Sequence, residues 1–219
     1  MIILIDMDGT IVYAPERNHI AIKKAFEDLG FDVPIEIIRD RFKFTEDPIH
    51  RIKRIIPEIS DKTALEIRYK MSNYFYELYK MSKLIPGAKQ TLDELSQNHI
   101  LILVTSRSNH NSTLKELEYL GIKQYFNKII TAGILYDPKT SFLSDFTKQR
   151  IQLLRYALDG QKNENVMVIG DRRKELEAGK ILGYPTVGVL SGVGTFEELK
   201  DVATYIIESI KNLNNIIKF

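Results

Sequence analysis

The chain has 219 residues, 44% hydrophobic and 27% charged, which is the composition of a globular protein that can bury a sizeable core. It contains no cysteine, so disulfides, thiolate metal sites and a cysteine nucleophile are excluded. The formal net charge is +2 without a basic stripe interleaved with aromatic residues, and apolar runs such as 100–104 are too short to span a bilayer, so we expect no nucleic-acid or membrane partner.

The first predicted element is a short buried strand over residues 2–5, followed by Asp6, Asp8 and a turn at Gly9. Residues i and i+2 of an extended chain point to the same side, so Asp6 and Asp8 can share one small space. A cation or a shared proton would relieve the repulsion between the two carboxylates, which favours a metal-binding or catalytic role. The alternative is that one aspartate belongs to the turn and the other caps a helix.

A long helical block follows this turn. Apolar spacing and capping residues predict helices over 16–29, 34–42, 47–56 and 63–79, the last one opened by a capping box at Thr63 and Glu66. We expect no strand inside the block. Residues 13–85 are therefore predicted to be an inserted helical cap.

From residue 86 onward, helical and strand patterns alternate. Predicted strands cover 100–104, 128–131, 166–169, 186–189 and 204–207, and predicted helices cover 86–98, 111–120, 147–158, 174–182 and 195–199. Such alternation predicts an α/β fold with a parallel sheet, built from residues 1–12 and 86–219. The Asn-rich C-terminal end is expected to fray.

Polar clusters directly follow three of the most hydrophobic predicted strands. After Asp6-Met7-Asp8, the second cluster is Thr105-Ser106-Arg107, and the third is Gly170-Asp171 with Glu175 four residues further on. The carboxyl ends of neighbouring parallel strands lie at one edge of a sheet, so we expect the three clusters to converge there.

These residue types suit phosphoryl transfer. Asp6 can attack phosphorus as the nucleophile, and Asp8 can protonate the leaving oxygen and later deprotonate water. A Mg²⁺ ion would be held by Asp6, Asp171 and a phosphate oxygen, because this hard cation prefers carboxylates and water. Thr105 or Ser106, with backbone amides of the next helix, would hold the other phosphate oxygens.

The motifs resemble, along the whole chain, those of haloacid dehalogenase (HAD) superfamily phosphatases. The matching segments are Asp6-Met7-Asp8-Gly9-Thr10, Val104-Thr105-Ser106-Arg107 and Gly170-Asp171-Arg172-Arg173-Lys174-Glu175, and the stretch 188–199 further resembles phosphoglycolate phosphatase-like members. The resemblance implies a Rossmann-like core with a helical cap, Asp6 as nucleophile and Asp8 as acid/base. It also implies Mg²⁺ bound by the Asp6 side chain, the Asp8 backbone carbonyl and Asp171. Gly9, Thr10, Thr105, Ser106 and Arg107 are then the candidate substrate contacts.

The chain departs from the family pattern at two points. The family's third motif is commonly a Lys-Pro pair, which does not occur here. Lys148 is our first choice for the cation that neutralises the transferring phosphoryl group, with Lys139 and Arg150 as alternatives. The fourth motif carries Glu175 where Asp is commoner. We assign Glu175 to the metal site, at the ion or at its bound water, with an acid on a helix surface as the alternative.

We therefore predict a cytoplasmic, Mg²⁺-dependent phosphatase whose partner is a small phosphorylated metabolite, with phosphoglycolate as the first candidate. The cap is expected to exclude water and to set specificity. The chain is expected to be a monomer or a homodimer. The alternatives are a sugar-phosphate phosphomutase on the same core, and a non-catalytic phospho-acceptor or binding module.

Overall fold

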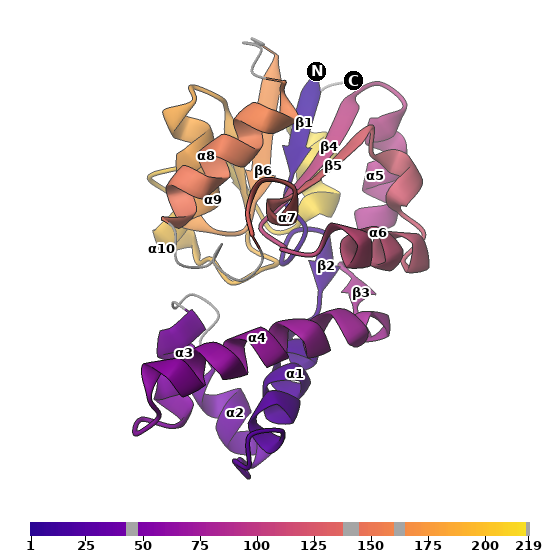
Figure 1. Ribbon diagram of the computed structural model, residues 1–219. Coiled ribbons are helices and arrows are strands. Elements are labelled where there is room, and N and C mark those ends of the chain that lie inside the picture. The colour runs from indigo at the N-terminus through magenta and orange to yellow at the C-terminus, as the bar shows by residue number, and fades with distance from the viewer. Residues whose placement is uncertain (43–47, 138–144, 160–164, 218–219) are drawn as a thin grey trace. The chain divides into compact units, whose positions relative to one another are not determined.

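The computed structural model describes residues 1–42, 48–137, 145–159 and 165–217 (Figure 1). The chain divides into two compact units, one formed by Met1–Tyr13 and Lys83–Phe219 and the other by Ala14–Ser82. We call them the core unit and the inserted unit. The predicted cap of 13–85 extends beyond the inserted unit at both ends, because Tyr13 and Lys83 pair as strand residues within the core unit.

The core unit is built on a six-stranded sheet in the order β5-β4-β1-β6-β7-β8, in which every pairing is parallel. The predicted parallel α/β sheet is thus confirmed. Strand β1 lies inside the sheet between β4 and β6, so the N-terminal segment forms its centre. The strands are β1 (Ile2–Ile5), β4 (Ile100–Thr105), β5 (Lys128–Thr131), β6 (Val166–Gly170), β7 (Thr186–Val189) and β8 (Tyr205–Ile207).

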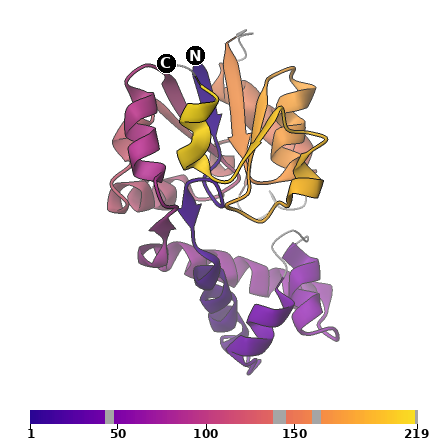
Figure 2. The same cartoon turned by 180° about the vertical axis from the view of Figure 1, so that it is seen from behind.

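Helices cover both faces of this sheet. Helices α8 (Phe146–Ala157) and α9 (Arg173–Ile181) share one apolar cluster with Leu4, Ile102 and Val168, which are partners in the strand register and point to the same face. Figure 2, seen from behind, shows the yellow 3₁₀ segment η4 (Ile210–Asn215) on the opposite face. The described part of the core unit also contains α5 (Ala88–Ser96), α6 (His110–Tyr119), the 3₁₀ turn η2 (Lys123–Tyr125), α7 (Ala132–Leu135) and α10 (Phe196–Leu199).

Two details of the core unit differ from the sequence prediction. Val12–Tyr13 (β2) and Lys83–Leu84 (β3) form a two-stranded antiparallel ribbon, which is too short to leave an alternating pattern in the sequence. The C-terminal end was expected to fray, but Ile210–Asn215 forms a 3₁₀ helix. Ile210 and Leu213 are fully buried, because they lie three residues apart and face the core together.

The inserted unit consists of helices with an apolar core of their own, which includes Ile22, Phe26, Ile38 and Ile67. Its elements are α1 (Pro15–Glu27), α2 (Ile35–Arg41), α3 (Pro48–Ile55), α4 (Asp61–Glu77) and the 3₁₀ turn η1 (Tyr79–Met81). Helix α4 begins two residues before the predicted Thr63, because the Ser60 side chain accepts a hydrogen bond from the Thr63 amide at 3.1 Å and acts as the cap.

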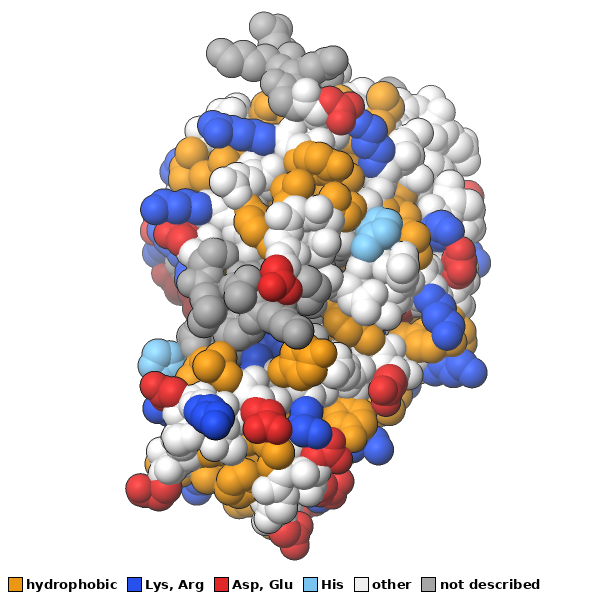
Figure 3. Space-filling view, viewed as in Figure 1, with side chains coloured by type: hydrophobic (Ala, Val, Ile, Leu, Met, Phe, Trp, Pro, Cys, Tyr) orange, Lys and Arg blue, Asp and Glu red, His pale blue; other side chains and the backbone are white. Residues whose placement is uncertain are grey.

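The surface carries charges of both signs. Figure 3 shows acidic and basic side chains interspersed over the face that it presents. Within the described ranges, no helix combines the length and the apolar character that crossing a membrane requires.

Candidate active site

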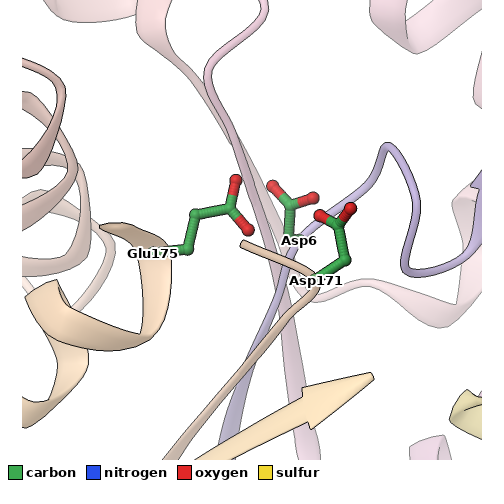
Figure 4. A group of neighbouring side chains, drawn as sticks. All are labelled: Asp6, Asp171 and Glu175. Carbon is green, nitrogen blue, oxygen red and sulfur yellow. The ribbon is translucent and has the colours of Figure 1, made fainter. Parts of the chain in front are cut away.

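Three buried carboxylates meet beside the carboxyl ends of β1 and β6. Asp6 follows β1, Asp171 follows β6, and Glu175 lies in the first turn of α9. All three residues are at most 3% exposed, and one oxygen from each lies within 4.8 Å of the others. Figure 4 shows the carboxylates of Asp6 and Asp171 side by side, with that of Glu175 directed toward Asp6. The convergence expected from the strand order is therefore present for Asp6 and Asp171, and Glu175 joins them rather than lying on a helix surface.

Burial makes this cluster costly without a cation. Desolvation raises the pKa of Asp171 to about 7 and, in the same way, that of Glu175 to about 7. The pKa of Asp6 also lies well above its usual value, through desolvation first and then through the charge of Glu175. Asp171 Oδ1 and Glu175 Oε2 are buried and have no hydrogen-bond partner among the described residues. Such orphaned carboxylate oxygens fit a divalent metal ion with oxygen ligands.

A glycine-containing loop after β7 fixes the orientation of Asp171. The Val193 amide donates a hydrogen bond to Asp171 Oδ2 at 2.7 Å, which leaves Oδ1 for another partner. A Cβ atom on Gly192 would lie 1.9 Å from Asp171 Oδ2, and one on Gly9 would lie 2.3 Å from it. Gly9 also has a φ of +82°. The carboxylate is thus packed between two backbone segments that admit no side chain.

Arg150 is the described cation that pairs with Asp6. Its Nη2 lies 3.2 Å from Asp6 Oδ1, and the side chain is almost fully buried. Nε and Nη1 of Arg150 have no hydrogen-bond partner in the described part of the chain. Lys148, the first choice from the sequence, is exposed near the start of α8, where its backbone amide donates a hydrogen bond to Asp145 Oδ1 at 3.1 Å. Lys139 lies outside the described residues.

Asp8 lies at the turn after β1, where a buried arginine contacts both of its oxygens. Arg107 Nε donates to Asp8 Oδ2 at 2.8 Å, and Nη2 donates to Oδ1 at 2.7 Å. The same guanidinium donates to Glu116 of α6 through Nη1 at 2.5 Å and Nη2 at 3.1 Å. Desolvation opposes the charge of Arg107, but the two carboxylates outweigh it and raise its pKa. The sequence singled out Arg107 as a substrate contact and gave no signal for Glu116.

The other candidate substrate contacts lie in the segments that end β1 and β4. Thr10 is fully buried, and its Oγ1 has no partner among the residues that the structure describes. Thr105 is buried as well, and its Oγ1 accepts a hydrogen bond from the Arg107 amide at 3.4 Å. Ser106 is half-buried. The Gly9 carbonyl accepts a hydrogen bond from Ser191 Oγ at 2.8 Å, which ties the first turn to the loop after β7.

Comparisons with known proteins identify the family of the chain. The model of the haloacid dehalogenase-like hydrolase family matches residues 3–189. A ribulose-1,5-bisphosphate 5-phosphatase from Halopiger xanaduensis is 26% identical and aligns over 84% of this chain and 82% of its own length. A phosphoglycolate phosphatase from Aquifex aeolicus is 23% identical, with 87% of this chain and 85% of the relative covered.

A solved structure from Clostridium difficile has the same fold. It superposes with a TM-score of 0.81 at 26% identity and covers 98% of this chain and 97% of its own. The family match extends from β1 to β7 and so includes all three strands that carry the site. The chain therefore belongs to the haloacid dehalogenase-like hydrolase family, and the prediction of a phosphatase of that family is confirmed.

Proposed function

We propose that this protein hydrolyses a small phosphomonoester with the aid of Mg²⁺, through a phosphoryl group carried transiently on Asp6. One observation carries the proposal. A carboxylate at the end of the central strand lies beside two further buried carboxylates and a buried arginine. This combination suits a nucleophile that must approach an anionic phosphate, because the cation and the arginine offset the repulsion.

The metal would be held by Asp6 and Asp171, with Glu175 at the ion or at its bound water. The buried oxygens of Asp171 and Glu175 that have no described partner support this assignment. When bound, Mg²⁺ supplies positive charge that stabilises the carboxylates in their ionised form and neutralises phosphate oxygens. An Asp8 carbonyl ligand, as the family resemblance implies, completes the proposed donor set.

The chain's own residues would act in two steps. An Asp6 oxygen attacks phosphorus, the bond from phosphorus to the leaving oxygen breaks, and Asp8 gives its proton to that oxygen. Water then attacks the phosphorus carried on Asp6 and gives a proton to Asp8, while the bond from phosphorus to the Asp6 oxygen breaks. Phosphate leaves and both aspartates are restored. Arg150 would stabilise the charge on the equatorial oxygens, while Thr105, Ser106 and the backbone of the Gly9 turn hold the phosphoryl group.

The proposed substrate is a small metabolite with phosphoglycolate as the first candidate. The two curated relatives are named for phosphoglycolate and for ribulose-1,5-bisphosphate, and each of these compounds carries a second anionic group besides the phosphoryl group that is removed. A panel should therefore contain phosphorylated acids and bisphosphates beside neutral sugar phosphates.

The test is phosphate release from this panel by the purified protein with Mg²⁺, with EDTA, and as the Asp6→Asn variant. We expect turnover with Mg²⁺, its loss in EDTA, and recovery when excess Mg²⁺ is added back. Asp6→Asn should lower turnover by more than about 1,000-fold, because the amide lacks a nucleophilic oxygen anion. The variant should still melt in a cooperative transition. Phosphate release by this variant at a rate near that of the wild type would contradict the role of Asp6.

A further inference from the structure

Arg107 lies between two carboxylates, one partly exposed and one fully buried. The Asp8 side chain is 37% exposed, whereas those of Arg107 and Glu116 are 4% and 0% exposed. Four hydrogen bonds of 2.5–3.1 Å join the guanidinium to the two acids. The arrangement is therefore ordered by burial, with Glu116 at its buried end and Asp8 at its solvent end.

The geometry of the Asp8 contact is that of a two-pronged pair. Each Asp8 oxygen receives one N–H, so the plane of the carboxylate is fixed against the plane of the guanidinium. A carboxylate oxygen has a second lone pair besides the one that accepts from Arg107, and 37% of the Asp8 side chain is exposed. A carboxylate held in this way can still exchange a proton with a group that approaches from the exposed side.

Glu116, at the buried end, restrains Arg107. Glu116 lies on α6 and receives two further N–H groups of Arg107, so the arginine cannot rotate about its long side chain without leaving a buried charge unpaired. Helix α6 follows β4 after a short connection, so Arg107 and Glu116 are close in sequence. Together they bind Asp8 in the turn after β1 through Arg107.

We propose that Arg107 is a positioning residue for Asp8, and that Glu116 holds Arg107 in the required orientation. The inference rests on the proposed function, in which the Asp8 O–H bond breaks and its proton passes to the leaving oxygen as the bond from phosphorus to that oxygen breaks. Arg107 acts through Asp8 and not on the phosphoryl group. Loss of Arg107 should therefore slow hydrolysis most for those substrates whose leaving group most needs that proton.

The leaving group separates this role from substrate binding. An alkyl phosphate has a poor leaving group and needs protonation, whereas p-nitrophenyl phosphate leaves as a stable anion and does not. The experiment measures kcat and KM for both substrates with Arg107→Lys and Glu116→Gln, and the inhibition constant of inorganic phosphate. The alkyl substrate is whichever member of the panel the wild type hydrolyses fastest. Arg155→Lys, an exposed position on α8, is the matched control.

We expect Arg107→Lys to lower kcat for the alkyl substrate by about 100-fold, because a misplaced acid forfeits much of the usual gain from general acid catalysis. The kcat for p-nitrophenyl phosphate should fall less than about threefold, and KM and the phosphate inhibition constant should stay within about twofold. Glu116→Gln keeps the shape of the side chain and should give a smaller loss, about tenfold, with the same dependence on the leaving group. Arg155→Lys should match the wild type.

Two results would overturn the inference. Equal losses with both substrates would indicate a general structural effect, and a raised KM with a raised phosphate inhibition constant would place Arg107 on the phosphoryl group. Both leave the proposed function standing, because the wild type and Asp6→Asn still test it separately. A wild type that hydrolyses neither substrate would remove the proposed function and this inference together.

Discussion

Arg150 and Lys148 are two residues apart on α8, but they occupy different faces of the helix. Arg150 precedes Leu153 and Leu154 by three and four residues, which places it on the buried face where it reaches Asp6. Lys148 falls off this face and is exposed. The helix phase thus places Arg150, and not Lys148, beside Asp6.

At this scale we predict that Arg150→Ala lowers kcat/KM by about 100-fold, as is typical when a donor to the transferring group is removed. Lys148→Ala should change it by less than about twofold, and it serves as the matched control on the same helix. Steady-state kinetics on the best substrate of the panel would measure both. A large loss in Lys148→Ala with a small one in Arg150→Ala would reverse the assignment.

At the scale of elements, the loop after β7 acts on a residue that follows β6. Its Val193 amide and the backbone of Gly192 enclose Asp171, so a change in the loop should disturb the proposed metal site without replacing any of its ligands. Gly183 offers a contrast within the same unit, because its φ is +79° and nothing lies within 4 Å of the position of a Cβ atom.

We predict that Gly192→Ala weakens Mg²⁺ binding by at least about tenfold and destabilises the fold by about 1–3 kcal/mol, since the added methyl overlaps Asp171. Gly183→Ala should cost about 1 kcal/mol through backbone strain and leave Mg²⁺ affinity unchanged. Calorimetric titration with Mg²⁺ and thermal melts would compare the two. Unchanged Mg²⁺ affinity in Gly192→Ala would show that the loop does not set the orientation of Asp171.

At the scale of the whole molecule, the buried acids link stability to pH. Without a cation, the pKa values of Asp171 and Glu175 lie near 7, above their usual 3.8 and 4.5. Between about pH 4 and 7 the folded chain therefore retains protons that the unfolded chain has lost, and the free energy of unfolding falls as pH rises through this range. A bound divalent ion reverses the effect, because it favours the ionised carboxylates.

We accordingly expect Mg²⁺ to raise the melting temperature strongly at pH 8 and hardly at pH 5, where protons compete for the same oxygens. Thermal melts at both values, with and without Mg²⁺, would measure the difference. In Asp171→Asn the rise at pH 8 should disappear. A rise at pH 5 as large as the one at pH 8 would contradict a site made of these acids.

Much of the fold followed from local patterns in the sequence. The apolar runs before Asp6, Thr105 and Asp171 predicted three central strands and their shared edge, because periodicity and turns are local properties. The ribbon of β2 and β3 was missed, since two-residue strands leave no period.

The candidate site could be predicted only in part from the sequence, because the partners of its arginines come from distant segments of the chain. Arg107 was expected at the substrate, and the structure pairs it with Asp8, 99 residues away along the chain. Glu116 belongs to no recognised motif, and only the structure shows that it accepts a hydrogen bond from Arg107. The outcome at Arg107 shows that a local motif can identify a residue while its partner remains unknown.

The central position of β1 has a consequence for biosynthesis. β1, which is followed by Asp6, is made before both of its neighbours in the sheet, because β4 and β6 begin at Ile100 and Val166. Translation at about 5–20 residues per second leaves this strand without partners for several seconds, while the intervening helices of Ala14–Ser82 already have everything needed for their own core. During synthesis β1 is therefore a hydrophobic strand with both edges unpaired until β4 has been made, and one edge stays open until β6 follows.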